Sequence, residues 1–143
     1  ILYEKEKFIF DTDQVYIPFG LEKNYNNYYI KVLKNKQSES LFEMIKSLEN
    51  QFTQFLVELN PSHEINFISQ IKTKANYGDF LQLKIPYKHN QFILDVFDQE
   101  NNRKTIFDLK KKQQVKLKLM LDSIWPFNNS YSAVIKVTSI ILV

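Results

Sequence analysis

The sequence predicts a mainly β fold of the α+β class, a small antiparallel β-barrel on which one long amphipathic helix packs. From His63 onward the chain is a series of short runs in which apolar and polar residues alternate, joined by polar turns. This pattern is typical of half-buried strands. Ahead of them, one segment repeats its apolar residues at steps of three and four, which is typical of an amphipathic helix.

The chain length suits one domain with a substantial core, since it has 143 residues. We expect residues 1–143 to form a single domain, in which N-terminal strands and a helix at 38–60 pack on a β unit at 63–143. No apolar stretch reaches the roughly 20 residues that cross a bilayer, so we expect no membrane partner.

Composition excludes several kinds of site. The chain has no cysteine, which rules out disulfides, thiolate nucleophiles and cysteine-bound metals. His63 and His89 are its only histidines and are far apart, so we expect no metal and no other cofactor.

Two extended pieces at 4–11 and 14–19, broken at Thr12-Asp13, and a strand at 27–34 precede the predicted helix. Ser40 and Glu43 suggest a capping box at its start, and Asn60-Pro61 ends it, because proline disfavours helical geometry in the residue before it. The helix carries one apolar stripe: Leu41, Ile45, Leu48, Phe52, Phe55, Leu56 and Leu59.

The β unit contains five predicted strands. They span residues 64–74, 80–87, 91–98, 115–125 and 131–143, with a turn at 77–79, a hairpin turn at 88–90 and a loop or short edge strand at 105–114. An OB-like barrel is the arrangement we expect. A two-sheet sandwich is the alternative, because periodicity does not separate the two.

Catalytic patterns are missing from the sequence. Asp95 and Asp98 lie an odd number of residues apart and should face opposite sides of a strand, so they do not form a convergent acid–base pair. Two glycines are too few for a phosphate-binding loop, and there is no Gly-x-Ser-x-Gly motif. We therefore expect a protein that is not an enzyme.

Lysines lie opposite apolar residues on four of the five predicted strands of the β unit, all but 91–98, so a barrel would carry them on its outer wall. Lysines neutralise phosphates, and aromatic rings stack on unpaired bases. The candidates for phosphate contact are Lys72, Lys74, Lys84, Lys116, Lys118 and Lys136, and those for stacking are Tyr77, Phe80, Trp125, Phe127 and Tyr131. The alternative is a solvated face with core aromatics, because the net charge is only +3 and an A+T-rich gene would also favour lysine.

Four short motifs in the C-terminal half support a family resemblance. They are Lys84-Ile85-Pro86, Phe97-Asp98, Ile124-Trp125 and Lys136-Val137. With the earlier strand and helix, these segments resemble the OB-fold single-stranded DNA-binding proteins of large nucleocytoplasmic DNA viruses and related cytoplasmic linear plasmids. The resemblance covers most of the chain from about Tyr28.

The resemblance implies a protein that coats and protects single-stranded DNA during viral or plasmid genome replication, with little sequence preference. Its place would be intracellular, at a cytoplasmic viral factory or plasmid replication site, or in the nucleus. The ligand could also be RNA. Possible protein partners are further copies of this chain or replication proteins. The alternative function is a non-catalytic structural or interaction subunit of a replication, transcription or virion assembly.

Overall fold

The computed structural model describes residues 8–62, 64–127 and 130–143, except the side chains of residues 8, 122–125 and 127. The N-terminal elements are β1 (Phe8–Asp11), β2 (Val15–Ile17), β3 (Glu22–Asn24), β4 (Asn27–Leu33) and α1 (Glu39–Leu59). The rest are β5 (Asn66–Ile68), β6 (Ile71–Lys74), β7 (Gly78–Ile85), β8 (Tyr87–Lys88), β9 (Gln91–Phe92), β10 (Asp95–Asp98), β11 (Arg103–Lys104), the 3₁₀ turn η1 (Ile106–Asp108), β12 (Gln113–Phe127) and β13 (Ser130–Leu142).

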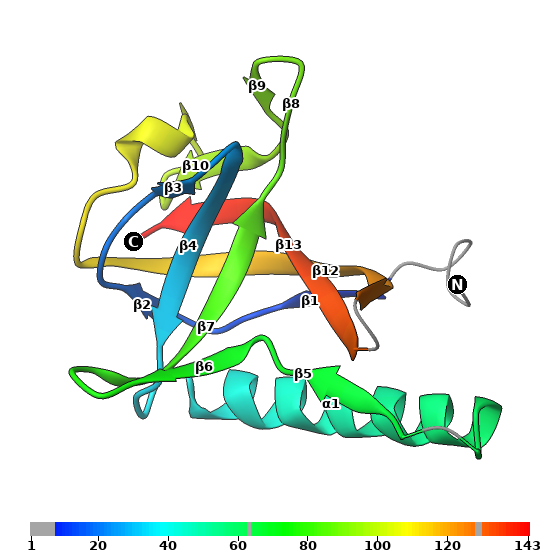
Figure 1. Cartoon of the computed structure of the whole chain (residues 1–143). Coiled ribbons are helices and arrows are strands. Elements are labelled where there is room, and N and C mark those ends of the chain that lie inside the picture. The colour runs from blue at the N-terminus through cyan, green and yellow to red at the C-terminus, as the bar shows by residue number, and fades with distance from the viewer. Residues whose placement is uncertain (1–7, 63, 128–129) are drawn as a thin grey trace.

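One curled sheet makes up the barrel (Figure 1). Its strands follow the order β1-β12-β13-β7-β4-β3, and β2, β5 and β6 are paired to β12, β13 and β7. β2 also packs against β4, which brings the two sides of the sheet together. The predicted mainly β, OB-like fold with one long helix is confirmed. The sheet is mixed, however, because β13 runs parallel to β5, β7 and β10.

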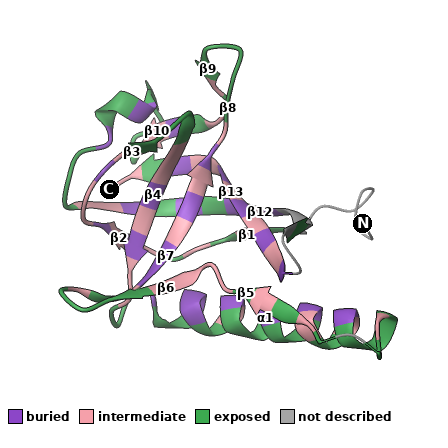
Figure 2. Ribbon diagram, in the orientation of Figure 1, coloured by how far each residue is buried: buried purple, intermediate pink, exposed green. Residues whose placement is uncertain are grey.

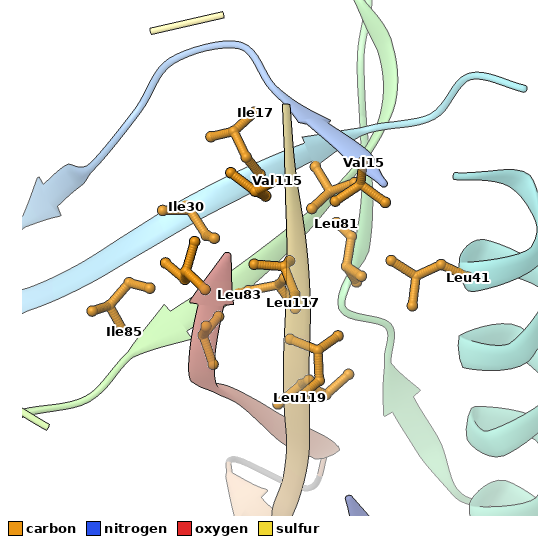
Figure 3. Close-up of a cluster of buried hydrophobic side chains, with 14 of the residues drawn as sticks. Val15, Ile17, Ile30, Leu41, Leu81, Leu83, Ile85, Val115, Leu117 and Leu119 are labelled. Carbon is orange, nitrogen blue, oxygen red and sulfur yellow. The ribbon is translucent and has the colours of Figure 1, made fainter. Parts of the chain in front are cut away.

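Strand alternation produces the core, as the sequence predicts. On β12, Val115, Leu117 and Leu119 are buried, while Lys116 and Lys118 are exposed. In Figure 3, side chains from β2, β4, β7 and β12 meet in one cluster with Leu41 of α1. Each fully buried leucine, isoleucine or valine contributes about 1.5–3 kcal/mol relative to an exposed one.

The predicted break at Thr12-Asp13 lies between β1 and β2, which both pair with β12. Thr12 joins the two pieces, because its amide donates to the Leu117 carbonyl at 2.8 Å and its hydroxyl accepts from the Leu117 amide at 3.0 Å. The first predicted strand is seen from Phe8, and its residues 4–7 lie outside the described residues.

Pro86 changes the predicted hairpin. Proline has no amide hydrogen to donate to a ladder, and β7 ends at Ile85. The predicted strands at 80–87 and 91–98 are therefore each divided. Only β8 and β9 form the hairpin, around His89 and Asn90, which both have positive φ as a two-residue type I′ turn requires.

The helix begins one residue after its N-cap, Ser38, and the predicted capping box of Ser40 and Glu43 is wrong. Ser38 is fully buried and its hydroxyl donates to the Leu33 carbonyl at 2.9 Å, so it ties the helix start to the end of β4. The apolar stripe is largely confirmed, although Leu59 is 57% exposed. Within the described residues, no helix is long and apolar enough to span a membrane.

Glu49 is a buried acid on the packed face of α1, and its side chain is part of the attachment to the barrel. One carboxylate oxygen accepts from the Ser69 hydroxyl at 2.6 Å and the other from the Gln70 amide at 2.8 Å. These bonds join the middle of the helix to the segment between β5 and β6. In Figure 1, α1 consequently lies across the end of the barrel and leaves the wall formed by β4 and β7 uncovered.

Replacing Glu49 with alanine should lower the free energy of unfolding by about 1–3 kcal/mol, because the Gln70 amide and Ser69 hydroxyl lose their acceptor. Urea denaturation measures the change. The matched control is E43A, which removes an exposed acid from the same helix and should change stability by less than about 0.5 kcal/mol. Equal effects of the two substitutions would contradict the role of Glu49.

Candidate nucleic-acid interface

Four of the predicted lysines lie on the outer wall of three adjacent strands. Lys136 of β13 is the register partner of Lys84 on β7 and of Met120 on β12. Lys116 and Lys118 precede Met120 on the same face of β12, because side chains alternate along a strand. We call Lys116, Lys118, Lys136 and Lys84 the basic belt. Lys116 and Lys118 are exposed, and Lys84 and Lys136 are half-buried.

The belt continues onto β4, where Tyr29 is the partner of Lys84 and Lys31 is the partner of Gln82. Sequence reasoning did not select Tyr29 or Lys31. The signal that could have found them is the alternation of residues 27–34, which places both opposite Ile30 and Val32. At the β12 end, Lys116 and Lys118 line a shallow hollow with Asp11, Ser139 and Ile141.

Lys31 is held in place by an acid and two rings. Its ammonium lies 3.4 Å from a Glu22 carboxylate oxygen, 5.5 Å from the Phe19 ring centroid and 5.2 Å from the Phe80 ring centroid. The side chain is 19% exposed. Lys31 therefore supports the wall, and a ligand would meet it only in part.

Phe80 is on the predicted face of β7 but is 3% exposed. Its ring is covered by Lys31 and by Tyr77, whose centroid is 5.4 Å away. Phe19 in turn contacts Tyr77 edge-on at 5.3 Å. The predicted stacking role of Phe80 is therefore wrong, because the ring is buried beneath its neighbours.

Tyr77 remains half-buried at the β6–β7 turn, beside the two predicted lysines of β6. Lys72 is the register partner of Phe80, and Lys74 is the partner of Gly78. These residues extend the lysine-bearing wall toward the start of β7. Gly78 has a φ of +80°, a conformation that glycine adopts more readily than other residues.

Tyr131 does not share a face with the belt. It lies on β13 with Ala133 and Ile135, which are buried, whereas Lys136 is on the opposite side of the strand. The Trp125 and Phe127 side chains, also predicted to stack, lie outside the described residues. Their backbones pair with Ser132 and Ser130.

A second group of rings, missed by sequence reasoning, lies at the mouth of the barrel. We call Tyr28, Tyr87, Phe92 and Phe107 the mouth cluster, since each ring has a neighbour in the group with a centroid 4.7–5.5 Å away. The four residues come from β4, β8, β9 and η1. Tyr87 and Phe92 are a register pair of the β8–β9 hairpin, whereas Tyr28 and Phe107 are far from them in the sequence, so no single pattern unites the four rings.

Asp98 holds the turn between β10 and β11. Its carboxylate accepts from the amides of Asn102 at 2.8 Å and Glu100 at 3.0 Å, and from the Asn102 side chain at 3.1 Å. The Asn102 amide is the main reason that the pKa of Asp98 is lowered from its ordinary value. Asp95 instead pairs with Arg103 at 2.9 Å. The sole arginine is therefore engaged with an acid, and Asp98 serves the turn.

The remaining motifs also have structural roles. In Lys84-Ile85-Pro86, the lysine points outward, the isoleucine is in the core and the proline ends the strand. The described part of the chain has no group of three or more His, Asp or Glu side chains that could hold a metal ion. The chemistry that this wall offers is attraction of anions and contact with aromatic faces.

The sequence matches no protein-family model and no curated protein. Solved structures do resemble the chain. The single-stranded DNA-binding protein gp2.5 of bacteriophage T7 has a TM-score of 0.61 at 15% identity, over 99% of this chain and 93% of gp2.5. The fold is shared.

A second phage protein gives the same result. The single-stranded DNA-binding protein from bacteriophage Enc34, in complex with single-stranded DNA, has a TM-score of 0.63 at 10% identity, over 94% of this chain and 85% of the phage chain. Its C-terminally truncated form has a TM-score of 0.62 at 12% identity, over 94% and 83%. At these identities the likeness concerns the fold.

The lowered pKa of Asp98 predicts a pH-dependent contribution to stability. Because the folded-state pKa is below the unfolded one, the contribution is present above the unfolded pKa and is lost as the pH falls through the folded pKa. D98N should therefore be less stable than wild type at neutral pH, and the difference should disappear in acid. Thermal unfolding across pH measures it. Equal stability of D98N and wild type at neutral pH, or a difference that persists unchanged in acid, would contradict this role of Asp98.

Proposed function

We propose that this chain binds single-stranded DNA along the basic belt, with little sequence preference and without catalysis. The observation that carries the proposal is the placement of Lys118, Lys136 and Lys84 on consecutive strands of one wall. Such a row of lysines can follow the phosphates of an extended DNA strand, and each lysine–phosphate contact releases counterions. The fold is that of two phage proteins whose structures are described as single-stranded DNA-binding proteins, one of them in complex with DNA.

The composition of the wall favours a single strand over a duplex. The basic belt carries no arginine, the side chain whose planar guanidinium makes bidentate base contacts, because the only arginine, Arg103, lies on β11 and pairs with Asp95. Unpaired bases can instead stack on rings, and Tyr29 and Tyr77 are half-buried rings beside the lysines of the wall. The same features would also bind single-stranded RNA, because phosphates and unpaired bases are common to both nucleic acids.

We further propose that the chain coats and protects single-stranded DNA during viral or plasmid genome replication. The four motifs of the sequence support an origin among large nucleocytoplasmic DNA viruses or cytoplasmic linear plasmids. That origin would place the protein at a cytoplasmic replication site or in the nucleus. Self-association and contacts with replication proteins belong to the same proposal.

The alternative function is a structural or interaction subunit of such an assembly. Exposed apolar side chains near the C-terminal end of α1 favour it, because Val57 is 46% and Leu59 57% exposed. Partner contact at this end of the helix would not involve the basic belt. The two functions therefore predict different sensitive residues.

Fluorescence anisotropy with an oligonucleotide of about 30 bases, a length that covers several binding sites of this size, tests the proposed function. Single-stranded DNA should bind more tightly than duplex, and the logarithm of affinity should fall linearly with the logarithm of salt concentration. RNA of the same length is measured in parallel. Affinity that is equal for duplex, or independent of salt, would favour the structural alternative.

Removing lysines from the belt should reduce the salt dependence of DNA affinity by a fixed amount for each phosphate contact that is lost. For K84Q and K118Q, the slope of log affinity against log salt should become shallower by about 0.7 for each lost phosphate contact. The double variant should show the sum, since the two residues lie on different strands. The charge-matched control is K46Q on the exposed face of α1, where the slope should stay at the wild-type value. A uniform decrease in all three variants would indicate only a net-charge effect.

A further inference from the structure

The mouth cluster has an inner and an outer part. Tyr28 and Phe92 are half-buried and pack on the core, with ring centroids 4.8 Å apart. Tyr87 contacts both, at 4.8 and 4.7 Å, and is 37% exposed. Phe107 stands edge-on to Phe92 at 5.5 Å and 84° and is 74% exposed. The inner rings thus connect the outer two to the barrel.

Phe107 is displayed on a turn that is fixed from both sides. Its neighbours Ile106 and Leu109 are 3% and 7% exposed, so they anchor η1 in the core. Thr105 and Asp108 form a reciprocal capping box. The Thr105 amide donates to the Asp108 carboxylate at 2.8 Å, and the Phe107 amide donates to the Thr105 hydroxyl at 3.3 Å. The exposed ring is therefore presented by an ordered backbone.

Exposure of this ring does not serve the stability of the fold. Transfer of a phenyl ring from water into the core is favourable, yet the capped turn keeps Phe107 outside while it buries the residue before it. Figure 2 shows the hairpin of β8 and β9 and the loop that carries η1 largely exposed above the barrel. A ring that is both ordered and exposed is available for stacking.

The cluster adjoins the end of the basic belt. Lys84 is followed by Ile85 and Pro86, and Tyr87 then begins the hairpin. The Ile93 amide donates to the Pro86 carbonyl at 2.9 Å, which closes the hairpin at its base. Tyr28 is the register partner of Ile85, on the inner face of β4 at the same end of the barrel as the hairpin. A DNA strand that leaves the belt at Lys84 and continues past the end of β7 would therefore arrive at the mouth cluster.

We propose that Phe107 and Tyr87 form a stacking platform for an unpaired base at the barrel mouth, where the bound DNA strand leaves the basic belt. This inference rests on the proposed function. The Phe107 ring has no hydrogen-bonding group, so it would hold any base by its aromatic face. Lys23, which lies 5.5 Å from the Tyr28 ring centroid, adds positive charge on the β3 side of the cluster.

Three variants test the platform by anisotropy with the same single-stranded oligonucleotide. F107A removes the ring, and F107L keeps an apolar side chain without an aromatic face. The control is L59A, which removes an exposed apolar side chain at the last residue of α1, a helix on the opposite side of the barrel from the β8–β9 hairpin (Figure 1). We expect F107A and F107L to bind about tenfold more weakly, with an unchanged salt slope, because stacking releases no counterions. L59A should bind as wild type does.

A 2-aminopurine base in the oligonucleotide gives a second readout, since stacking on a ring alters its fluorescence. The change should be smaller with F107A and F107L at saturating protein. Wild-type affinity of F107A, or recovery of affinity in F107L, would overturn the platform while the basic belt remains. Failure of the wild-type protein to bind any single strand would instead overturn the proposed function, and the platform with it.

Discussion

The alternation of apolar and lysine residues on β12 is the constraint on which the rest of the structure depends. This strand pairs with β1, β2 and β13, and its leucines form the centre of the core. Because neighbouring side chains point to opposite faces, burial of Leu117 and Leu119 forces Lys116 and Lys118 outward. A shift of one residue in register would bury the lysines. Core and basic wall thus have a common cause.

Polar contacts between α1 and the barrel decide which surfaces stay free. Ser38 fixes the start of the helix to the end of β4, and Glu49 fixes its middle beside Gln70. A buried carboxylate with two donors has little freedom to move, since any other position leaves it unpaired. The helix is therefore held over the end of the barrel. The outer wall of β4 and β7 stays open to a ligand.

Loops at the barrel mouth obtain their order from side-chain hydrogen bonds. Asp98 binds the amides of its own turn, and Thr105 with Asp108 caps η1. The chain has only two glycines, and residues such as Asn90 and Asn101 adopt positive φ in their place, as asparagine does more readily than most residues. These turns hold aromatic side chains outside the core, which hydrophobic packing alone would not do.

The sequence by itself determined the mainly β fold, the long helix, the break at Thr12 and the outward lysines of β7 and β12, because periodicity is a local property of the chain. It did not determine the burial of Phe80, the opposite face of Tyr131 or the mouth cluster. Those depend on which strands become neighbours and on what covers each ring. Lys31 covers Phe80 from β4, a strand far away in the sequence, and the mouth cluster joins rings from four separate elements. Only the tertiary structure decides such contacts, because they join residues that no local pattern relates.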